Sequence, residues 1–119
     1  PESIPAGTYD VAIVATGSTE LRPTIPGPDG LAVVTARAVL EGRESVKGRV
    51  VVAGGGCMGA QTAEHLAARG HAVTIVEALS AVAADAPVDD RALLLGRLAG
   101  HGVEIRTDTR LIRRGPGHV

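Results

Sequence analysis

Residues 49–59 read RVVVAGGGCMG, so that a run of valines leads directly into a cluster of glycines. β-Branched residues such as valine favour strands, and the alanine-rich residues 60–69 that follow favour a helix. Gly54, Gly56 and Gly59 match the pattern G-x-G-x-x-G, which is a weak signal alone but a specific one between a strand and a helix. This stretch therefore predicts the strand–turn–helix start of a dinucleotide-binding unit.

The three glycines would have separate tasks in such a unit. Gly54 permits the tight turn, Gly56 lets a pyrophosphate approach the backbone, and Gly59 lets the helix pack closely on the strand. The helix that begins near Cys57 directs free N–H groups and the positive end of its dipole at the phosphates. Cys57 itself is interpreted as a small packing residue beneath the loop rather than as a redox thiol.

An acidic residue stands where the ribose of a bound dinucleotide is expected. Residues 72–76 predict a second strand, and Glu77 follows at its carboxyl end, 18 residues beyond Gly59. A carboxylate there accepts both ribose hydroxyls, and it repels the 2′-phosphate of NADP. Residues 78–82 contain no basic residue, so NAD(H) is favoured over NADP(H). The predicted cofactor contacts are Gly54, Gly55, Gly56, Cys57, Met58, Gly59, Glu77 and Ala78.

Further strands and helices are expected on both sides of this unit. A helix over residues 36–41 follows Thr35 as its cap. Another begins at Asp89 or Asp90 and extends through Leu98, and residues 103–106 form a third strand. The alternation predicts an α/β fold, a truncated, Rossmann-like, three-layer parallel sheet flanked by helices, with strand order third, second, first. Residues 109–112 stand close enough to the third strand to pair with it in a C-terminal β-hairpin.

The amino-terminal part of the chain has a different character. Residues 9–15 read YDVAIVA, a pattern typical of a strand buried on both faces. Residues 22–30 contain three prolines and two glycines, which neither a helix nor a central strand accommodates. This connector is the predicted domain boundary, between residues 1–30 and residues 31–119. The apolar residues 11–15 are expected to pack beside the free edge of the first sheet strand, or to exchange with a second copy and form a homodimer.

Composition limits the expected partners and location. The formal net charge is −1 over 119 residues, so no nucleic acid is expected as a partner. No apolar run approaches the roughly 20 residues that span a bilayer, and no secretory signal opens the chain. We therefore expect no membrane contact and a cytoplasmic location. Four arginines near the end are interpreted as a solvated edge: Arg106, Arg110, Arg113 and Arg114.

No catalytic or metal-binding residue is expected. Cys57 is the only cysteine, which excludes a disulfide or a redox pair within these residues. No cysteine or further histidine stands at ligand spacing around His65 and His71. Any redox chemistry would therefore come from bound cofactors.

The motifs and their order resemble one family of flavoproteins. Residues 10–18, 23–27 and 50–59 are similar to the pyridine nucleotide-disulfide oxidoreductase superfamily, whose members have two dinucleotide-binding domains. Residues 59–77 look closest to the branch of NADH:flavin oxidoreductases similar to 2,4-dienoyl-CoA reductase and trimethylamine dehydrogenase. One departure is Gln61, where the family often has glutamate two residues after the last glycine of the pattern.

This resemblance implies a place for the chain in a larger enzyme. Residues 1–30 would be the last strand of an FAD-type domain plus the proline-rich crossover, and residues 31–119 a partial NAD(H)-binding domain. The parent protein would pass hydride from NADH to FAD, with FMN in some members, and its flavin-binding and substrate domains would lie outside this chain. The 119 residues alone are then expected to bind no flavin and to be inactive.

Two other functions stay open at this point. The domain could hold ADP or NAD without turnover, or it could be an unrelated nucleotide-sensing module with the same fold. Residues 15–17, which read ATG, and the proline crossover argue against the second of these alternatives.

Overall fold

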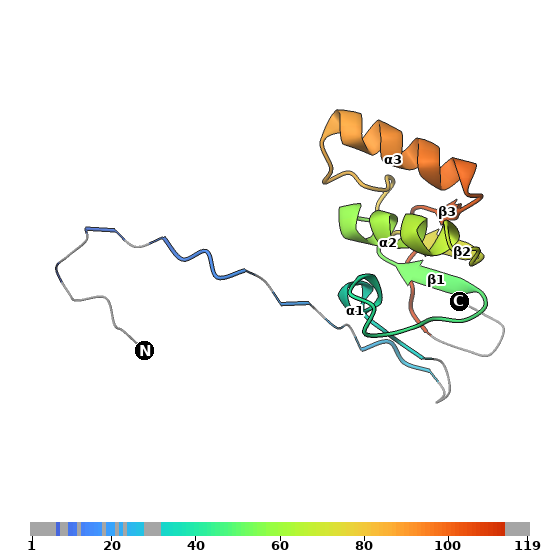
Figure 1. Cartoon of the computed structure of the whole chain (residues 1–119), viewed down its shortest axis with the longest axis horizontal. Helices are drawn as coiled ribbons and strands as arrows, with labels where there is room; N and C mark the ends of the chain where they lie inside the picture. Colours follow the sequence, from blue (N-terminus) through green and yellow to red (C-terminus); the bar gives the residue numbers. More distant parts are fainter. Residues whose placement is uncertain are drawn as a thin grey trace.

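The structure is a computed structural model, which describes residues 32–113 and, ahead of them, residues 7, 10, 11, 13–17, 19, 20, 22 and 24–27. Three helices and three strands alternate in this part of the chain (Figure 1). They are α1 (Ala36–Leu40), β1 (Val50–Ala53), α2 (Cys57–Ala67), β2 (Val73–Val76), α3 (Val88–Gly100) and β3 (Glu104–Arg106).

The three strands form one parallel sheet with the order β1-β2-β3. Val50 to Ala53 pair in register with Val73 to Val76, and Thr74 to Val76 pair with Glu104 to Arg106. The strand order predicted from the sequence is confirmed, and so are the α/β class and the parallel, helix-flanked sheet. The carboxyl ends of all three strands consequently meet at one edge of the sheet, where ligands bind in folds of this kind.

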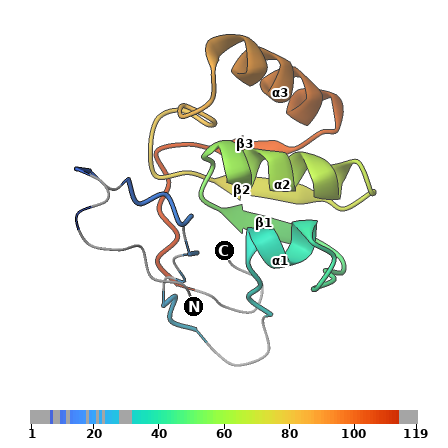
Figure 2. The same cartoon turned by 60° about the vertical axis from the view of Figure 1, so that its left-hand side comes forward.

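The helices share one apolar core on one face of the sheet. Right-handed crossovers place α2 and α3 on the same side, and Figure 2 shows α2 in front of the sheet, between α3 above and α1 below. The helices of the described residues thus all lie on the same face of the sheet. The core is made of small and branched side chains, since the chain has a single aromatic residue: Val39, Ala60, Ala63, Leu66, Val73, Ile75, Val82, Ala83, Leu94 and Leu98.

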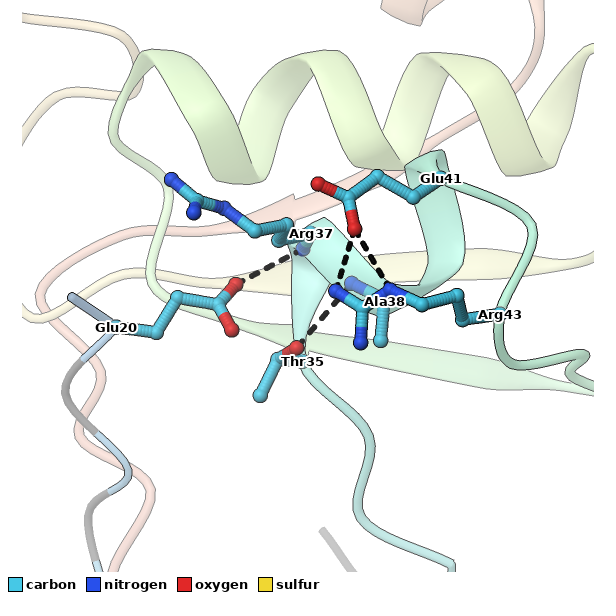
Figure 3. A network of polar contacts seen from close by, with 6 residues as sticks. All are labelled: Glu20, Thr35, Arg37, Ala38, Glu41 and Arg43. Atoms are coloured by element: carbon cyan, nitrogen blue, oxygen red, sulfur yellow. Dashed lines mark hydrogen bonds and ion pairs between the residues drawn. The ribbon is translucent and has the colours of Figure 1, made fainter. Parts of the chain in front are cut away.

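Helix α1 is fixed at its start by two polar side chains. Thr35 Oγ1 accepts a hydrogen bond from the Ala38 N–H at 3.2 Å, which confirms Thr35 as the predicted cap. Glu20 Oε1 accepts from the Arg37 N–H at 3.0 Å, as Figure 3 shows beside the Thr35 contact. Hydrogen bonding to the Thr35 side chain, with further help from Arg37, lowers the pKa of the Glu20 carboxyl. Glu20 therefore joins the segment ahead of residue 31 to the helix that precedes β1.

The predicted C-terminal hairpin is wrong. Residues 107–113 contain no strand. The Asp108 N–H instead donates to the Leu79 carbonyl at 3.0 Å, and the Thr109 N–H donates to the Glu77 carbonyl at 2.9 Å. The chain thus turns across the carboxyl end of β2, and these two N–H groups bond to residues that follow this strand and not to β3.

The buried strand predicted over residues 9–15, of which the structure describes residues 10, 11 and 13–15, is also wrong for this chain by itself. Its described residues form no strand, and Val11, Ile13 and Val14 are 77%, 90% and 82% exposed. A strand of this composition is stable only when neighbouring strands pair with its backbone and other elements cover its faces. Neither condition is met by the described residues of this segment, which do not join the sheet beside β1.

No helix in the described part of the chain is long and apolar enough to cross a membrane.

Candidate dinucleotide-binding site

The glycine loop connects β1 to α2 by the tight turn that the sequence predicts. Gly54 has φ +98°, a conformation that residues with a side chain rarely adopt. Its N–H donates to the Val76 carbonyl at 2.9 Å, which ties the end of β1 to the end of β2. Helix α2 then begins at Cys57, with Gly56 as its N-cap.

Gly59 brings the first turn of α2 against the loop. A Cβ at this position would fall far inside contact distance of the Gly54 carbonyl oxygen and 3.5 Å from Val52 Cγ1. The close approach of helix and strand that was predicted for this glycine is therefore present. Only a residue without a side chain fits here.

The N-terminal end of α2 presents backbone N–H groups to the carboxyl edge of the sheet that are not used in the helix's own hydrogen bonds. The Ala60 N–H is the first to bond back within the helix, to the Gly56 carbonyl at 2.9 Å. The N–H groups of Cys57, Met58 and Gly59 therefore have no partner within the helix. Met58 is 52% exposed, and Cys57 is half-buried at the rim of a cavity of about 240 Å³ between α2 and α3.

Gly55 faces the protein rather than the open side of the loop. It is buried, and a Cβ there would lie 3.0 Å from Ile75 Cγ2 and from Val82 Cγ2. Gly56, by contrast, is exposed and has an ordinary extended backbone, with φ −61° and ψ 176°. The packing of the protein therefore leaves no room for a side chain at Gly55, whereas the backbone and the surroundings of Gly56 would accept one.

Glu77 is buried at the end of β2 and turned toward the glycine loop. Its Oε2 accepts from the Gly55 N–H at 2.6 Å, and its Oε1 accepts from the Leu79 N–H at 2.7 Å. These N–H groups, that of Leu79 most of all, lower the pKa of the Glu77 carboxyl. The side chain is therefore an ionised carboxylate, and each oxygen keeps a second lone pair for a further donor. Ala78, the next predicted contact, is exposed.

Asp85 also belongs to the site, although nothing in the sequence alone predicted it there. Its Oδ1 accepts from the Cys57 N–H at 2.7 Å, across 28 residues of chain. Both of its carboxylate oxygens lie 3.5 Å from the place of a Cβ on Gly56. The residue belongs to the alanine-rich loop between β2 and α3, where no spacing rule links an acidic residue to the glycine loop.

The site therefore combines a helix N-terminus, a glycine that leaves space beside it, and an ionised carboxylate at the neighbouring strand. Of the eight predicted contacts, the structure brings Gly54 to Gly59 and Glu77 together within one edge of the sheet. These groups suit a ligand that has anionic phosphates and neutral hydroxyls side by side.

Comparison with known proteins agrees with this geometry. The family model of the pyridine nucleotide-disulphide oxidoreductases matches residues 6–116. An NADH oxidase of Thermoanaerobacter brockii is 38% identical over 125 residues, which cover 99% of this chain and 19% of that protein.

Two solved structures have the same arrangement. A 2-naphthoyl-CoA reductase in complex with 2-naphthoyl-CoA has a TM-score of 0.71 and 30% identity, over 79% of this chain and 14% of that one. The water-forming NADH oxidase of Lactobacillus brevis, bound to NADH, has a TM-score of 0.50 and 27% identity, over 74% of this chain and 21% of that one. The chain thus spans about a fifth of these proteins or less. The fold, the glycine loop and the family match lead to one conclusion: the chain belongs to the pyridine nucleotide-disulphide oxidoreductase family.

Proposed function

We propose that this chain holds the ADP half of NAD(H), as the NAD(H)-binding part of a flavin-dependent oxidoreductase that passes hydride from NADH to flavin. The observation that carries the proposal is the position of Glu77, an ionised carboxylate hydrogen-bonded to the glycine loop at the open end of α2. Family membership and the named NADH oxidases support the same function.

Each group has a separate part in holding the cofactor. The N–H groups of Cys57, Met58 and Gly59 would bind the pyrophosphate, and the helix dipole would favour its charge. The absent side chain at Gly56 would leave room for it, and Glu77 would accept the hydroxyls of the adenosine ribose. The bound nicotinamide supplies the hydride, while the protein contributes binding and orientation.

The remaining parts of the enzyme are proposed to lie outside these residues. Residues 1–30 would be the end of an FAD-type domain and its crossover, and residues 31–119 part of the NAD(H)-binding domain. FAD, and FMN in some branches, would bind elsewhere in the parent protein. The branch similar to 2,4-dienoyl-CoA reductase stays a proposal, because the relatives described above have other names. The cytoplasmic location stays a prediction.

Cofactor choice tests the assignment of Glu77. The wild-type chain is expected to bind NADH at least about tenfold more tightly than NADPH, because the carboxylate repels the 2′-phosphate. Glu77→Gln should reduce this preference by removing the charge at nearly constant size. Isothermal titration calorimetry with NADH and NADPH measures both affinities.

The matched control is Glu44→Gln, since Glu44 is an exposed glutamate outside this edge of the sheet. It should leave the ratio of the two affinities unchanged. Equal affinities of the wild-type chain for NADH and NADPH would show that Glu77 does not face the ribose, and no binding of either would refute the proposed function.

A homodimer formed through the open sheet edge is a separate proposal. β1 pairs only with β2 among the described residues, so its other edge offers unpaired N–H and C=O groups. The exposed Val11, Ile13 and Val14 are apolar enough to be buried against that edge in a second copy. Multi-angle light scattering is expected to give twice the 12.0 kDa mass of the chain. A monomer at all concentrations tested would rule this exchange out.

A further inference from the structure

Asp85 occupies the place where the proposed cofactor would put its pyrophosphate. Its carboxylate accepts a hydrogen bond from Cys57, the first N–H of α2, at 2.7 Å. The same carboxylate lies 3.5 Å from where a Cβ on Gly56 would stand. The space that Gly56 leaves open beside the backbone is thus filled by an anionic side chain of the protein itself.

A carboxylate and a phosphate compete for such a place because they have the same chemistry. Both are anions whose oxygens accept hydrogen bonds from backbone N–H groups, and both are stabilised by the positive end of a helix dipole. The Cys57 N–H has one hydrogen to donate, so it cannot hold both oxygens at full strength. Two negative charges about 4 Å apart also repel each other by about 1 kcal/mol even in water.

The backbone around Asp85 is held against the glycine loop. The Ala83 N–H donates to the Gly55 carbonyl at 2.7 Å, and the Ala86 N–H closes a turn on the Ala83 carbonyl at 3.1 Å. Arg91 Nε donates to the Val82 carbonyl at 2.9 Å. Val82 and Ala83 are buried, whereas Asp85 is exposed. Rotation of the Asp85 side chain into solvent is therefore the easiest way to free the Cys57 N–H.

We propose that Asp85 acts as an internal competitor of the cofactor, so that the pyrophosphate of NAD(H) binds only when the Asp85 carboxylate leaves the N-terminus of α2. This inference rests on the proposed function and goes beyond it. In this proposal Asp85 lowers the affinity for NAD(H) by competing with it, whereas Glu77 raises that affinity by binding it.

Two variants separate the charge of Asp85 from its hydrogen bond. Asp85→Asn keeps the size and one acceptor oxygen but removes the charge, and it should tighten NADH binding about fivefold, because a neutral amide oxygen holds the Cys57 N–H less strongly than a carboxylate does. Asp85→Ala removes both and should tighten binding by at least as much, while lowering the melting temperature of the ligand-free chain because the Cys57 N–H at the start of α2 loses its acceptor. Inorganic pyrophosphate, titrated in place of NADH, should show the same order of affinities.

The matched control is Asp89→Asn. Asp89 is an exposed aspartate in the first turn of α3, so this variant changes the net charge equally without touching the glycine loop. Its affinity for NADH should stay within about twofold of the wild-type value, as expected for a screened surface charge. In amide NMR spectra of the chain, Asp85→Ala should shift the Cys57 signal before any ligand is added, and NADH should shift the same signal in the wild-type chain.

The results distinguish the two proposals. If the wild-type chain binds NADH and both Asp85 variants bind it equally or more weakly, Asp85 is no competitor and the inference is overturned while the proposed function stands. An equal gain in Asp89→Asn would attribute the effect to net charge and would also overturn it. If neither the wild-type chain nor Asp85→Asn binds NADH at all, the proposed function itself fails.

Discussion

Gly56→Val is expected to abolish NADH binding and to leave the domain folded. The backbone of Gly56 has φ −61° and ψ 176°, which valine adopts without strain. A Cβ would lie 3.5 Å from the Asp85 oxygens, an ordinary contact distance. The branched side chain would, however, fill the space that the pyrophosphate needs beside the N-terminus of α2. We expect the affinity for NADH to fall by at least about 100-fold, roughly 3 kcal/mol of binding free energy.

Calorimetry with NADH measures this loss, and circular dichroism measures whether the fold is kept. The matched control is Gly96→Val, because Gly96 lies on α3 with open space around its Cβ position. That variant should bind NADH as the wild-type chain does. Unchanged affinity in a folded Gly56→Val chain would place the phosphates elsewhere and remove the central argument for the site.

Gly59→Ala is expected to disrupt the fold itself. The added methyl group would overlap the Gly54 carbonyl oxygen, which is backbone and cannot rotate away as a flexible side chain could. Relief requires α2 to move off the sheet, which would open the core around the buried Ala60 and Ala63. Overpacking of this kind costs about 1–3 kcal/mol and sometimes more. Because the clash is with backbone, we expect a loss of at least about 3 kcal/mol, a large fraction of the stability of a small domain.

Urea unfolding followed by circular dichroism gives the free energy of unfolding of the variant. Gly96→Ala is the control, since it adds the same methyl group at an open helical position. Alanine favours a helix over glycine by about 1 kcal/mol, so this control should be slightly more stable than the wild-type chain. Wild-type stability in Gly59→Ala would mean that α2 is not held by close packing at this glycine.

Gly56 and Gly59 thus differ in the reason why a glycine is needed at each position. At Gly59 the reason lies inside the protein, in the contact between helix and loop. At Gly56 the protein tolerates a side chain, and the proposed reason for glycine is the space that the pyrophosphate needs. The pair of variants separates a loss of binding from a loss of structure, which a single variant in the loop could not do.

The sequence by itself determined the elements that depend on neighbouring residues. The valines before Gly54 predict β1, the alanine-rich stretch predicts α2, and Thr35 caps α1 as expected. The parallel order of the strands followed from their alternation with helices. The position of Glu77 at the end of β2 followed from its spacing to Gly59. These features are local because propensity, capping and backbone freedom act over a few residues at a time.

Only the tertiary structure decided which distant groups meet. Asp85 contacts Cys57 across 28 residues, and Glu77 bonds Gly55 across 22. The Thr109 N–H donates to the Glu77 carbonyl, and residues 109–112 form no hairpin with β3. Residues 11–15 have the composition of a buried strand, but no strand pairs with the described ones, which stay exposed. The physical reason is the same in each case: a long-range contact forms when folding brings together partners that satisfy its hydrogen bonds and bury its surface, and no local pattern records where those partners lie.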